Sequence, residues 1–399
     1  MSSGLFRSAV VLGLMSAVGP FSIDIYLPAL PAIGEALDAS VAATQMTLTV
    51  FFLSFGISQM IYGPLSDQVG RKLPVYVGLT IFSLGSFGCA FAPTIEWLIA
   101  ARFVQGIGAA AVMVIPRAII RDLHTGYEAT RLMALVMLVI SVSPMLAPLA
   151  GTGLIALGGW PTIFLFLAVA AICSIVLVSA TLPETLVPEK RTPVNLRTLV
   201  AGSRELLSDS RFMGPTLIGG CGMASFFVFL ASASFVYTQQ YGLSLLQFSL
   251  AFAVNAIGFF SSSQFAARLG ERVGMARMIA WAVTGFFVVE LALLLLTVAG
   301  WGSFPVLMVF LFAGNACLGL VIPTAMVLAL DQHGHIAGLA SSLGGTMQMV
   351  IGGLMIAAAS PFFDGTALPM VATIAVCAVM AFTISKVLRV GAPETRGTV

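Results

Sequence analysis

Long apolar segments recur along the whole chain and are separated by short polar turns. Each segment is about as long as the roughly 20 residues that a helix needs to cross a membrane, and none alternates strictly like a barrel strand. The pattern predicts twelve transmembrane helices and excludes an outer-membrane barrel. The predicted spans are 6–33, 40–65, 73–92, 95–121, 129–154, 158–181, 212–239, 245–267, 276–299, 302–329, 336–361 and 367–388.

The composition indicates that these helices face lipid. Of the 399 residues, 59% are hydrophobic and only 9% are charged, and the mean hydropathy is +1.05. A soluble domain carries roughly 25% charged residues, so this chain has too few to cover a water-facing surface. The net charge of +2 does not suggest a nucleic-acid partner. The five cysteines lie within apolar segments and are expected to be small buried side chains, not disulfides or metal ligands.

The positive charges predict the orientation of the helices. In a twelve-span arrangement, 17 of the 18 lysines and arginines fall on one side, whereas an eleven-span arrangement would scatter them. The opposite turns hold no lysine or arginine but contain Glu35, Asp38, Glu96 and Asp364. The positive-inside rule therefore predicts a multi-pass protein of the bacterial inner membrane with both termini cytoplasmic. The first apolar segment is expected to be the first helix, not a cleavable signal peptide.

The longest polar linker divides the chain into two similar halves. It is predicted at 182–211, between six-helix bundles at 1–181 and 212–399, the second of which ends in a short cytoplasmic tail. Two short segments of the first half recur weakly in the second, which favours duplication. These pairs are 66–70 with 270–274 and 114–116 with 321–323. Two six-helix repeats with a site between them are typical of secondary transporters.

A charged, glycine-containing segment follows the second helix and reads Gly63-Pro-Leu-Ser-Asp67-Gln-Val-Gly70-Arg71-Lys72. Its two glycines are expected to permit a tight backbone path. Asp67, Arg71 and Lys72 place opposite charges at a helix junction, where they can pair or cap helix ends. The alternative interpretation is a positive anchor that only stabilises the topology.

Four segments carry a resemblance to a known family. The segment 63–72 resembles G-x-L-S-D-x-x-G-R-K, the signature loop of the major facilitator superfamily. The segment 102–110 resembles the R-x-x-Q-G-x-G-A-A motif of its proton-driven exporters. The segment 143–152 resembles their antiporter motif, G-x-x-x-G-P-x-x-G-G, with serine, alanine and threonine in place of three glycines. The segment 22–31 resembles the D-x-Y-L-P-A-L-P stretch of drug exporters, and the set is most similar to the bicyclomycin and chloramphenicol resistance (Bcr/CflA) group.

The resemblance implies an all-α integral membrane protein with twelve helices in two pseudo-symmetric bundles. It also implies proton-coupled efflux of small amphipathic drugs by alternating access, by a monomer in the lipid bilayer that needs no cofactor beyond the proton gradient. An exporter of a sugar, amino acid or siderophore is the alternative, and proton-coupled uptake is less expected. No nucleophile–base pair, histidine-rich metal motif or G-x-x-x-x-G-K-[ST] loop occurs in the sequence, which argues against an enzyme or a primary pump.

Two charges are predicted inside the membrane, in the first and fourth helices. Asp24 lies roughly 25 Å along helix 1 and Arg102 roughly 10 Å into helix 4, which runs the other way, so both belong to the outer half of the bilayer. Charges in this position usually mark function, and an acid and a base at similar depth are expected to pair. The alternative makes Asp24 an interface residue and Arg102 a structural brace.

The first-half helices are also expected to contribute to a mixed polar and apolar substrate pocket. Asp24, Tyr26, Arg102, Gln105 and Met113 are its predicted lining, because Gln105 lies one turn from Arg102. From the second half the expected lining residues are Asn255, Asn315 and Gln348.

Proton coupling is assigned to Asp24 with Arg102. A carboxylate in a low-dielectric cavity has a raised pKa that a nearby guanidinium lowers, so separation of the pair would load a proton and closure would expel it. Ser16, two turns earlier, is not an acid, which predicts one proton per cycle and a preference for neutral or zwitterionic drugs. In the ninth predicted helix, Glu290 is expected to snorkel outward or to contact a neighbouring helix.

Switching between two states is assigned to the charged segment and to helix 5. Asp67 and Arg71 are expected to act with one or more of the charged residues at the helix 4–5 junction. These candidates are Arg121, Asp122, Glu128 and Arg131. Pro144 and Pro148 can kink helix 5, and Gly151 permits close helix packing.

Overall fold

The computed structural model describes residues 3–124, 126–191, 193 and 195–388. All elements within these ranges are helical, and twelve of them are long and apolar enough to cross a membrane. The twelve spans are Val10–Ala36, Val41–Val69, Lys72–Ala90, Ile95–Leu123, Arg131–Gly158, Pro161–Thr181, Ser210–Gln240, Leu245–Val273, Met275–Val298, Phe304–Leu330, Gly334–Phe362 and Ala367–Val387. The predicted all-α fold with twelve spans is confirmed.

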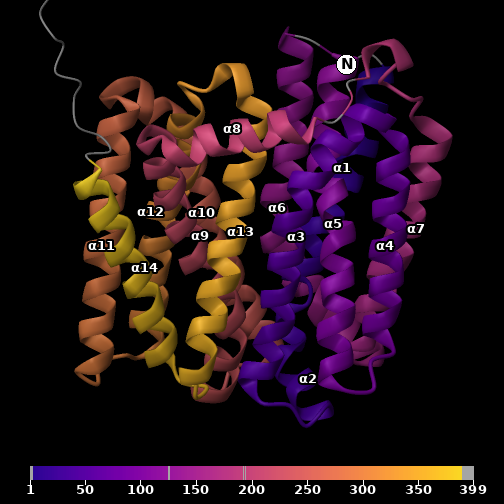
Figure 1. Cartoon of the computed structure of the whole chain (residues 1–399). Helices are drawn as coiled ribbons and strands as arrows, with labels where there is room; N and C mark the ends of the chain where they lie inside the picture. Colours follow the sequence, from indigo (N-terminus) through magenta and orange to yellow (C-terminus); the bar gives the residue numbers. More distant parts are fainter. Residues whose placement is uncertain (1–2, 125, 192, 194, 389–399) are drawn as a thin grey trace, which may run out of the picture. The chain divides into compact units, whose positions relative to one another are not determined.

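The chain forms two compact units, of which unit 1 comprises Met1–Leu196 and Gly242–Ala253. Its long helices run side by side in Figure 1, in indigo to magenta. The elements of unit 1 are α1 (Ser3–Asp24), η1 (Leu27–Ala29), α2 (Leu30–Ala36), α3 (Val41–Val69), α4 (Lys72–Ala90), α5 (Ile95–Leu123), α6 (Gly126–Gly158), α7 (Pro161–Thr181) and η2 (Pro188–Lys190).

Unit 2 comprises Arg197–Tyr241 and Val254–Val399. The chain passes from unit 1 to unit 2 inside the predicted 182–211 linker, between Leu196 and Arg197. The helices that lie in unit 2 wholly or for most of their length are α8 (Leu196–Ser208), α9 (Ser210–Phe235), the π-helical η3 (Val236–Gln240), α10 (Leu245–Val273), α11 (Met275–Val298), α12 (Phe304–Leu330), η4 (Gly334–Ile336), α13 (Ala337–Ala359), η5 (Ser360–Phe362) and α14 (Ala367–Val387).

The first turns of α10 belong to unit 1 because they bind α6. The hydroxyl of Ser249 donates a hydrogen bond to the carbonyl oxygen of Pro148 over 3.1 Å and lies 2.9 Å from the hydroxyl of Thr152. α6 itself continues through both Pro144 and Pro148 without ending.

Glycines on α5 allow it to pack tightly against α3 and α4. A Cβ atom on Gly106 would overlap the carbonyl oxygen of Phe51 and the hydroxyl of Ser54, both in α3. A Cβ atom on Gly108 would overlap the backbone of Phe82 in α4. Because these two glycines of the 102–110 motif have no side chain, α5 can pack directly against the backbones of α3 and α4.

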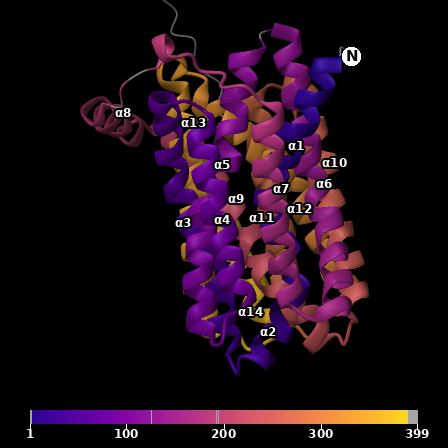
Figure 2. The same cartoon turned by 90° about the vertical axis from the view of Figure 1, so that its right-hand side faces the viewer.

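The first transmembrane segment is broken at the residue that carries the buried acid. α1 ends at Asp24, and η1 and α2 continue the segment after a short turn, although the sequence pattern predicted one continuous helix. Pro28 has no N–H to donate to the carbonyl oxygen of Asp24, four residues earlier, which ends the regular ladder there. α2 lies at the end of unit 1 opposite the N-terminal label (Figure 2). Discontinuous helices are typical of transporter binding sites.

The segment predicted as a turn after helix 2 is largely helical. α3 continues through Gly63 and ends where Gly70 adopts a φ of +100°. A Cβ atom on Gly63 would meet only a Val114 methyl at 3.9 Å, so the predicted backbone constraint at Gly63 is wrong. Gly70 is required both by its φ and by space, because a Cβ atom would lie 2.8 Å from a carboxylate oxygen of Glu184.

The helix α8 was not predicted from the sequence. Its buried residues include Leu206, and Gly202 lies against Leu339 of α13, whereas Val200 and Leu207 are exposed. Both views show α8 crosswise to the long helices of unit 2 (Figures 1 and 2). The apolar residues of 196–208 recur at helical spacing, a signal that would have revealed this amphipathic helix.

Candidate functional site

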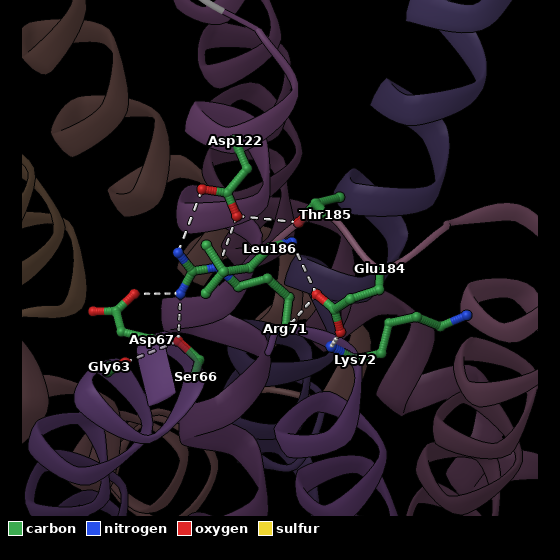
Figure 3. Close-up of polar contacts among 9 residues, drawn as sticks. All are labelled: Gly63, Ser66, Asp67, Arg71, Lys72, Asp122, Glu184, Thr185 and Leu186. Atoms are coloured by element: carbon green, nitrogen blue, oxygen red, sulfur yellow. Dashed lines mark hydrogen bonds and ion pairs between the residues drawn. The ribbon is translucent and has the colours of Figure 1, made fainter. Parts of the chain in front are cut away.

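A charged cluster surrounds Arg71 at the junction of α3 and α4 (Figure 3). The Arg71 side chain donates from Nη1 to the Asp67 carboxylate and to the Ser66 hydroxyl, and from Nε to Oδ2 of Asp122 over 2.7 Å. Arg71 is only 6% exposed. Burial alone would lower the pKa of its guanidinium, but the hydrogen bonds to Asp122 and Asp67 outweigh burial and raise the pKa above its ordinary value. This guanidinium therefore ties the end of α3 to the end of α5.

Glu184, after α7, caps the start of α4. Its carboxylate accepts hydrogen bonds from the backbone N–H groups of Arg71 at 2.8 Å and Lys72 at 3.1 Å, and from that of Leu186 at 3.1 Å (Figure 3). An anion is favourable at a helix N-terminus, where backbone N–H groups lack helical partners. Partial burial would raise the pKa of Glu184, but these hydrogen bonds hold it below its ordinary value.

Thr185 adds a second contact from the same segment, because its hydroxyl donates to Oδ2 of Asp122 over 3.1 Å. The sequence analysis missed both Glu184 and Thr185. Their only local signal is an acid and a hydroxyl residue directly after the proline that follows an apolar span. We call the whole set the junction cluster, which consists of Ser66, Asp67, Arg71, Asp122, Glu184 and Thr185.

Only one of the predicted partners of the charged segment joins the junction cluster. Asp122 binds Arg71, whereas Glu128 pairs with His124 at 3.1 Å. Arg121 and Arg131 are exposed and make no ion pair among the described residues. The prediction is therefore wrong for these three candidates in this structure.

We expect Glu184→Gln to loosen the segment after α7 from α4. Replacement of the carboxylate by an amide weakens the interaction with the helix N-terminus by about 1 kcal/mol, a value reduced by solvent screening. The backbone N–H groups of Arg71 and Lys72 should therefore exchange hydrogen faster in Glu184→Gln than in the wild type at neutral pH. Because the folded-state pKa of Glu184 is lowered, the wild-type protection should persist at neutral pH and disappear as the pH falls through that pKa.

Glu189→Gln in the same linker is the matched control, because Glu189 is exposed. Equal exchange at the start of α4 in both variants and the wild type would show that Glu184 does not hold this segment in place.

Arg102 is fully buried in unit 1 and is surrounded by rings and backbone. Its guanidinium carbon lies 4.7 Å from the ring centroid of Tyr26 and 4.2 Å from that of Phe51. Nη1 donates to the carbonyl oxygen of Ser22 over 3.2 Å and to the side-chain oxygen of Gln105. Stacking on two aromatic faces replaces part of the hydration that the cation loses. Arg102 thus connects α5 to the last turns of α1.

Asp24 is 4% exposed and faces a different helix. Its carboxylate accepts one hydrogen bond, from the Ser143 hydroxyl of α6 over 3.4 Å. A Cβ atom on Gly151 would overlap the carbonyl oxygen of Ile25, so α6 packs directly on the turn after Asp24. Ser143 stands where the antiporter motif has its first glycine, and this departure supplies the hydroxyl that binds the acid.

The expected direct pairing of Asp24 with Arg102 is not present in this structure. Among the described residues Asp24 forms no ion pair, and the Arg102 guanidinium contacts Ser22, two residues earlier on α1. The Asp24 carboxylate therefore interacts with α6, whereas the Arg102 guanidinium interacts with the backbone of α1.

The other predicted lining residues of unit 1 are mostly enclosed. Tyr26 is fully buried, and its hydroxyl lies 2.9 Å from that of Thr47. Gln105 is also fully buried and donates to the Ser86 hydroxyl over 2.7 Å, so both ends of its amide have partners within the bundle. Met113 is partly exposed. The predicted polar residues of unit 1 are therefore enclosed in the bundle, and Gln105 joins α5 to α4.

In unit 2 the predicted polar residues form two groups. The amide of Asn315 donates to the amide oxygen of Asn255 over 3.5 Å, and Asn255 in turn lies 3.5 Å from the hydroxyl of Tyr237. Tyr237 lies in η3, and π-helical segments often mark functional sites. Gln348 lies elsewhere, beside Gly219 of α9. The sequence analysis missed Tyr237.

The family follows from a comparison of the whole sequence with known families. A family model described as Major Facilitator Superfamily matches residues 12–357, which is most of the chain. The chain belongs to the major facilitator superfamily. It is therefore a multi-pass membrane transporter of small molecules, and the resemblance stated from its motifs is confirmed.

Three relatives agree with this assignment. An uncharacterized MFS-type transporter, YdgK of Bacillus subtilis, is 35% identical over 377 residues, covering 93% of this chain and 92% of the relative. A bicyclomycin resistance protein homolog of Haemophilus influenzae is 28% identical over 94% of each chain. Multidrug resistance protein D of Escherichia coli is 30% identical over 87% of this chain and 86% of that protein.

Within this major facilitator chain, the signature loop and the helix motifs have separate structural roles. The signature loop supplies Asp67 and Arg71 to the junction cluster, whereas the 102–110 motif supplies Arg102 and the glycines that bring α5 close to α3 and α4. The antiporter motif places Ser143 beside Asp24. All three roles are fulfilled inside unit 1.

Proposed function

We propose that this carrier exports small amphipathic drugs in exchange for protons, by alternating access. The observation that carries the proposal is the Asp24 carboxyl, which is buried at a break in the first transmembrane segment and has one hydroxyl donor among the residues that the structure describes. Two relatives are named for resistance to bicyclomycin or to multiple drugs, which supports a drug as the substrate. The motif resemblance supports export with proton exchange.

In the proposed cycle Asp24 is the group that binds the transported proton. A buried carboxylate with one donor is poorly compensated, so protonation is favourable when the site opens to the acidic side. Arg102 acts as a positioning residue, because it holds the carbonyl of Ser22 and thereby fixes the last turn of α1. Drug entry from the inside displaces the proton. With no second acid at Ser16, one proton per cycle passes through this site.

The junction cluster is proposed to act in switching. Asp67→Asn should reduce the turnover of export about fivefold, because a weakened, partly exposed ion pair changes the balance of states by about 1 kcal/mol. Equilibrium drug binding should change little, because the cluster lies at the α3–α4 junction and not at the α1 break. Transport rate and drug affinity are measured on the same purified preparation.

Asp38→Asn is the control for this substitution. Asp38 lies in the turn before α3 with a φ of +48°, a conformation that asparagine also tolerates. An unchanged turnover in Asp67→Asn would contradict the switching role, and an equal loss in both variants would indicate a general effect of the substitution.

We place both termini and the 182–211 segment in the cytoplasm of a bacterial cell, with the carrier in the inner membrane. The asymmetric distribution of lysine and arginine along the sequence supports this orientation. A cysteine at position 195 should be protected from an impermeant thiol reagent added to intact cells. Efficient labelling from outside would reverse the orientation.

Transport by the purified carrier in liposomes tests the function directly. An imposed pH gradient should drive chloramphenicol or bicyclomycin across the membrane without nucleotide, and a susceptibility screen in an exporter-deficient strain identifies further drugs. Gradient-driven movement of a sugar, amino acid or siderophore, with no drug transported, would favour the alternative of a metabolite exporter. Drug movement that ignores the pH gradient would refute proton exchange.

A further inference from the structure

A carboxyl group lies on the inner face of α11, outside the site described above. Glu290 is 2% exposed and occupies the same buried stripe as Phe286 and Leu293, while Val288 and Leu295 on other faces are 56% and 62% exposed. The expectation that Glu290 snorkels outward is therefore wrong, and its alternative, contact with a neighbouring helix, holds. A residue buried at this position of a membrane-spanning helix would ordinarily be apolar.

The neighbouring helix α12 has a gap that receives this carboxyl. Gly314 lies on the buried side of α12 between Leu311 and Leu318. A Cβ atom on Gly314 would overlap Oε1 of Glu290, so any larger residue would collide with the acid. The buried acid and the glycine form a complementary pair across α11 and α12, which we call the Glu290 notch.

No described group compensates a negative charge in the Glu290 notch. Oε2 of Glu290 is buried without a hydrogen-bond partner, and Glu290 makes no ion pair among the described residues. The titratable groups that face it from the helices packed on α11 are the thiols of Cys317 on α12 and Cys377 on α14. The cation on α11 itself, Arg277, is 13 residues earlier and therefore about 20 Å away along the helix.

An isolated carboxylate in such a place is strongly unfavourable. Transfer of an unpaired ion into a protein interior costs several kcal/mol even after relaxation, and inside a membrane such groups are neutralised or paired. A protonated acid avoids this cost. The geometry of the notch therefore requires a proton, independently of Asp24 in unit 1.

We propose that Glu290 is a second proton-binding site, which holds a resident proton inside unit 2 and does not exchange it with the drug. α11, α12 and α14 all belong to unit 2, so the surroundings of the carboxyl stay with it when that unit moves as a body. No hydrogen bond leads away from Oε2 among the described residues. The carrier thus contains two membrane carboxyls, of which Asp24 exchanges its proton and Glu290 retains it.

Infrared spectroscopy of the purified carrier tests the resident proton without any need for a reagent to reach it. The wild type and Asp24→Asn should both show, at pH 7.5, a carboxylic acid C=O band that Glu290→Gln lacks. In D₂O this band should shift as deuterium replaces the proton, and the shift should develop more slowly than that of exposed groups. Identical spectra of the wild type and Glu290→Gln, or a shift as fast as that of exposed groups, would overturn the proposal.

A matched pair of substitutions tests the notch itself. Gly314→Ala should lower the thermal unfolding temperature because its methyl group displaces the acid, and Gly314→Ala combined with Glu290→Ala should recover part of the loss. Gly338→Ala in α13, where a Cβ atom would meet no atom within 4 Å, is the control in unit 2. A wild-type unfolding temperature in Gly314→Ala, or no recovery in the double variant, would refute the notch.

The claim that the Glu290 proton is not exchanged rests on the proposed antiport. Glu290→Gln should release as many protons on drug addition as the wild type does, and loss of half of them would show that Glu290 takes part in coupling. If the wild type releases none, the antiport fails while the infrared test of the resident proton still stands.

Discussion

Asp24→Asn is expected to abolish proton release on drug addition while leaving the protein folded. The amide has almost the same shape as the carboxyl and can still accept the hydrogen bond from Ser143, but it cannot bind the transported proton. Proton release should fall to background. The measurement uses purified, monodisperse Asp24→Asn with a pH-sensitive dye in weakly buffered solution, and drug is added at a saturating concentration.

Ser143→Ala is the control for this experiment. It removes the one hydrogen bond that a described residue donates to the carboxyl but keeps the acid, so drug-driven release should remain measurable. Wild-type-like release in Asp24→Asn would remove Asp24 from the coupling mechanism. If Asp24 had only a structural role, the substitution would instead lower the yield of folded protein and leave release per folded molecule unchanged.

The sequence predicted the number of spans because lipid imposes length and hydrophobicity on each of them. It did not predict the break after Asp24, because the segment as a whole is apolar enough to count as one span. The consequence of Pro28 depends on one missing N–H and not on hydropathy. α8 was missed for the opposite reason, since its helical pattern is short and lies within a polar linker.

The residues of the site were identified more reliably than their contacts. Asp24 and Arg102 are both buried charges in unit 1, as predicted, yet depth along a helix does not determine the direction of a side chain. Arg102 reaches the backbone of Ser22, while Asp24 turns toward Ser143 on α6. The direction around the axis follows from helix packing, which a single sequence does not reveal.

Long sequence separations hid the remaining partners. Glu184 binds the start of α4 from 113 residues away, and neither residue has a local feature that names the other. Similarly, Gly314 and Glu290 were inconspicuous separately, and only their contact across α11 and α12 shows why a glycine faces an acid. The motifs of the first half were recognisable because each lies within about ten consecutive residues.

Arg102→Lys is expected to destabilise the carrier strongly although the charge is kept. The planar guanidinium stacks between Tyr26 and Phe51 and donates to Ser22, whereas an ammonium is a more strongly hydrated point charge without the planar fork. Loss of the stack and of charged hydrogen bonds should lower the free energy of unfolding by about 3 kcal/mol. Equilibrium unfolding in mixed detergent micelles measures this change.

Arg121→Lys provides the same substitution on the same helix, at an exposed position. It should change the free energy of unfolding by less than about 0.5 kcal/mol.

Export by Arg102→Lys should also fall, by about tenfold or more, because the last turn of α1 loses the contact that positions Asp24. Equal stability of the two variants would show that the stacked guanidinium contributes little. A stable Arg102→Lys variant with normal export would exclude the positioning role. The guanidinium of Arg102 would then not be needed to bind the carbonyl oxygen of Ser22.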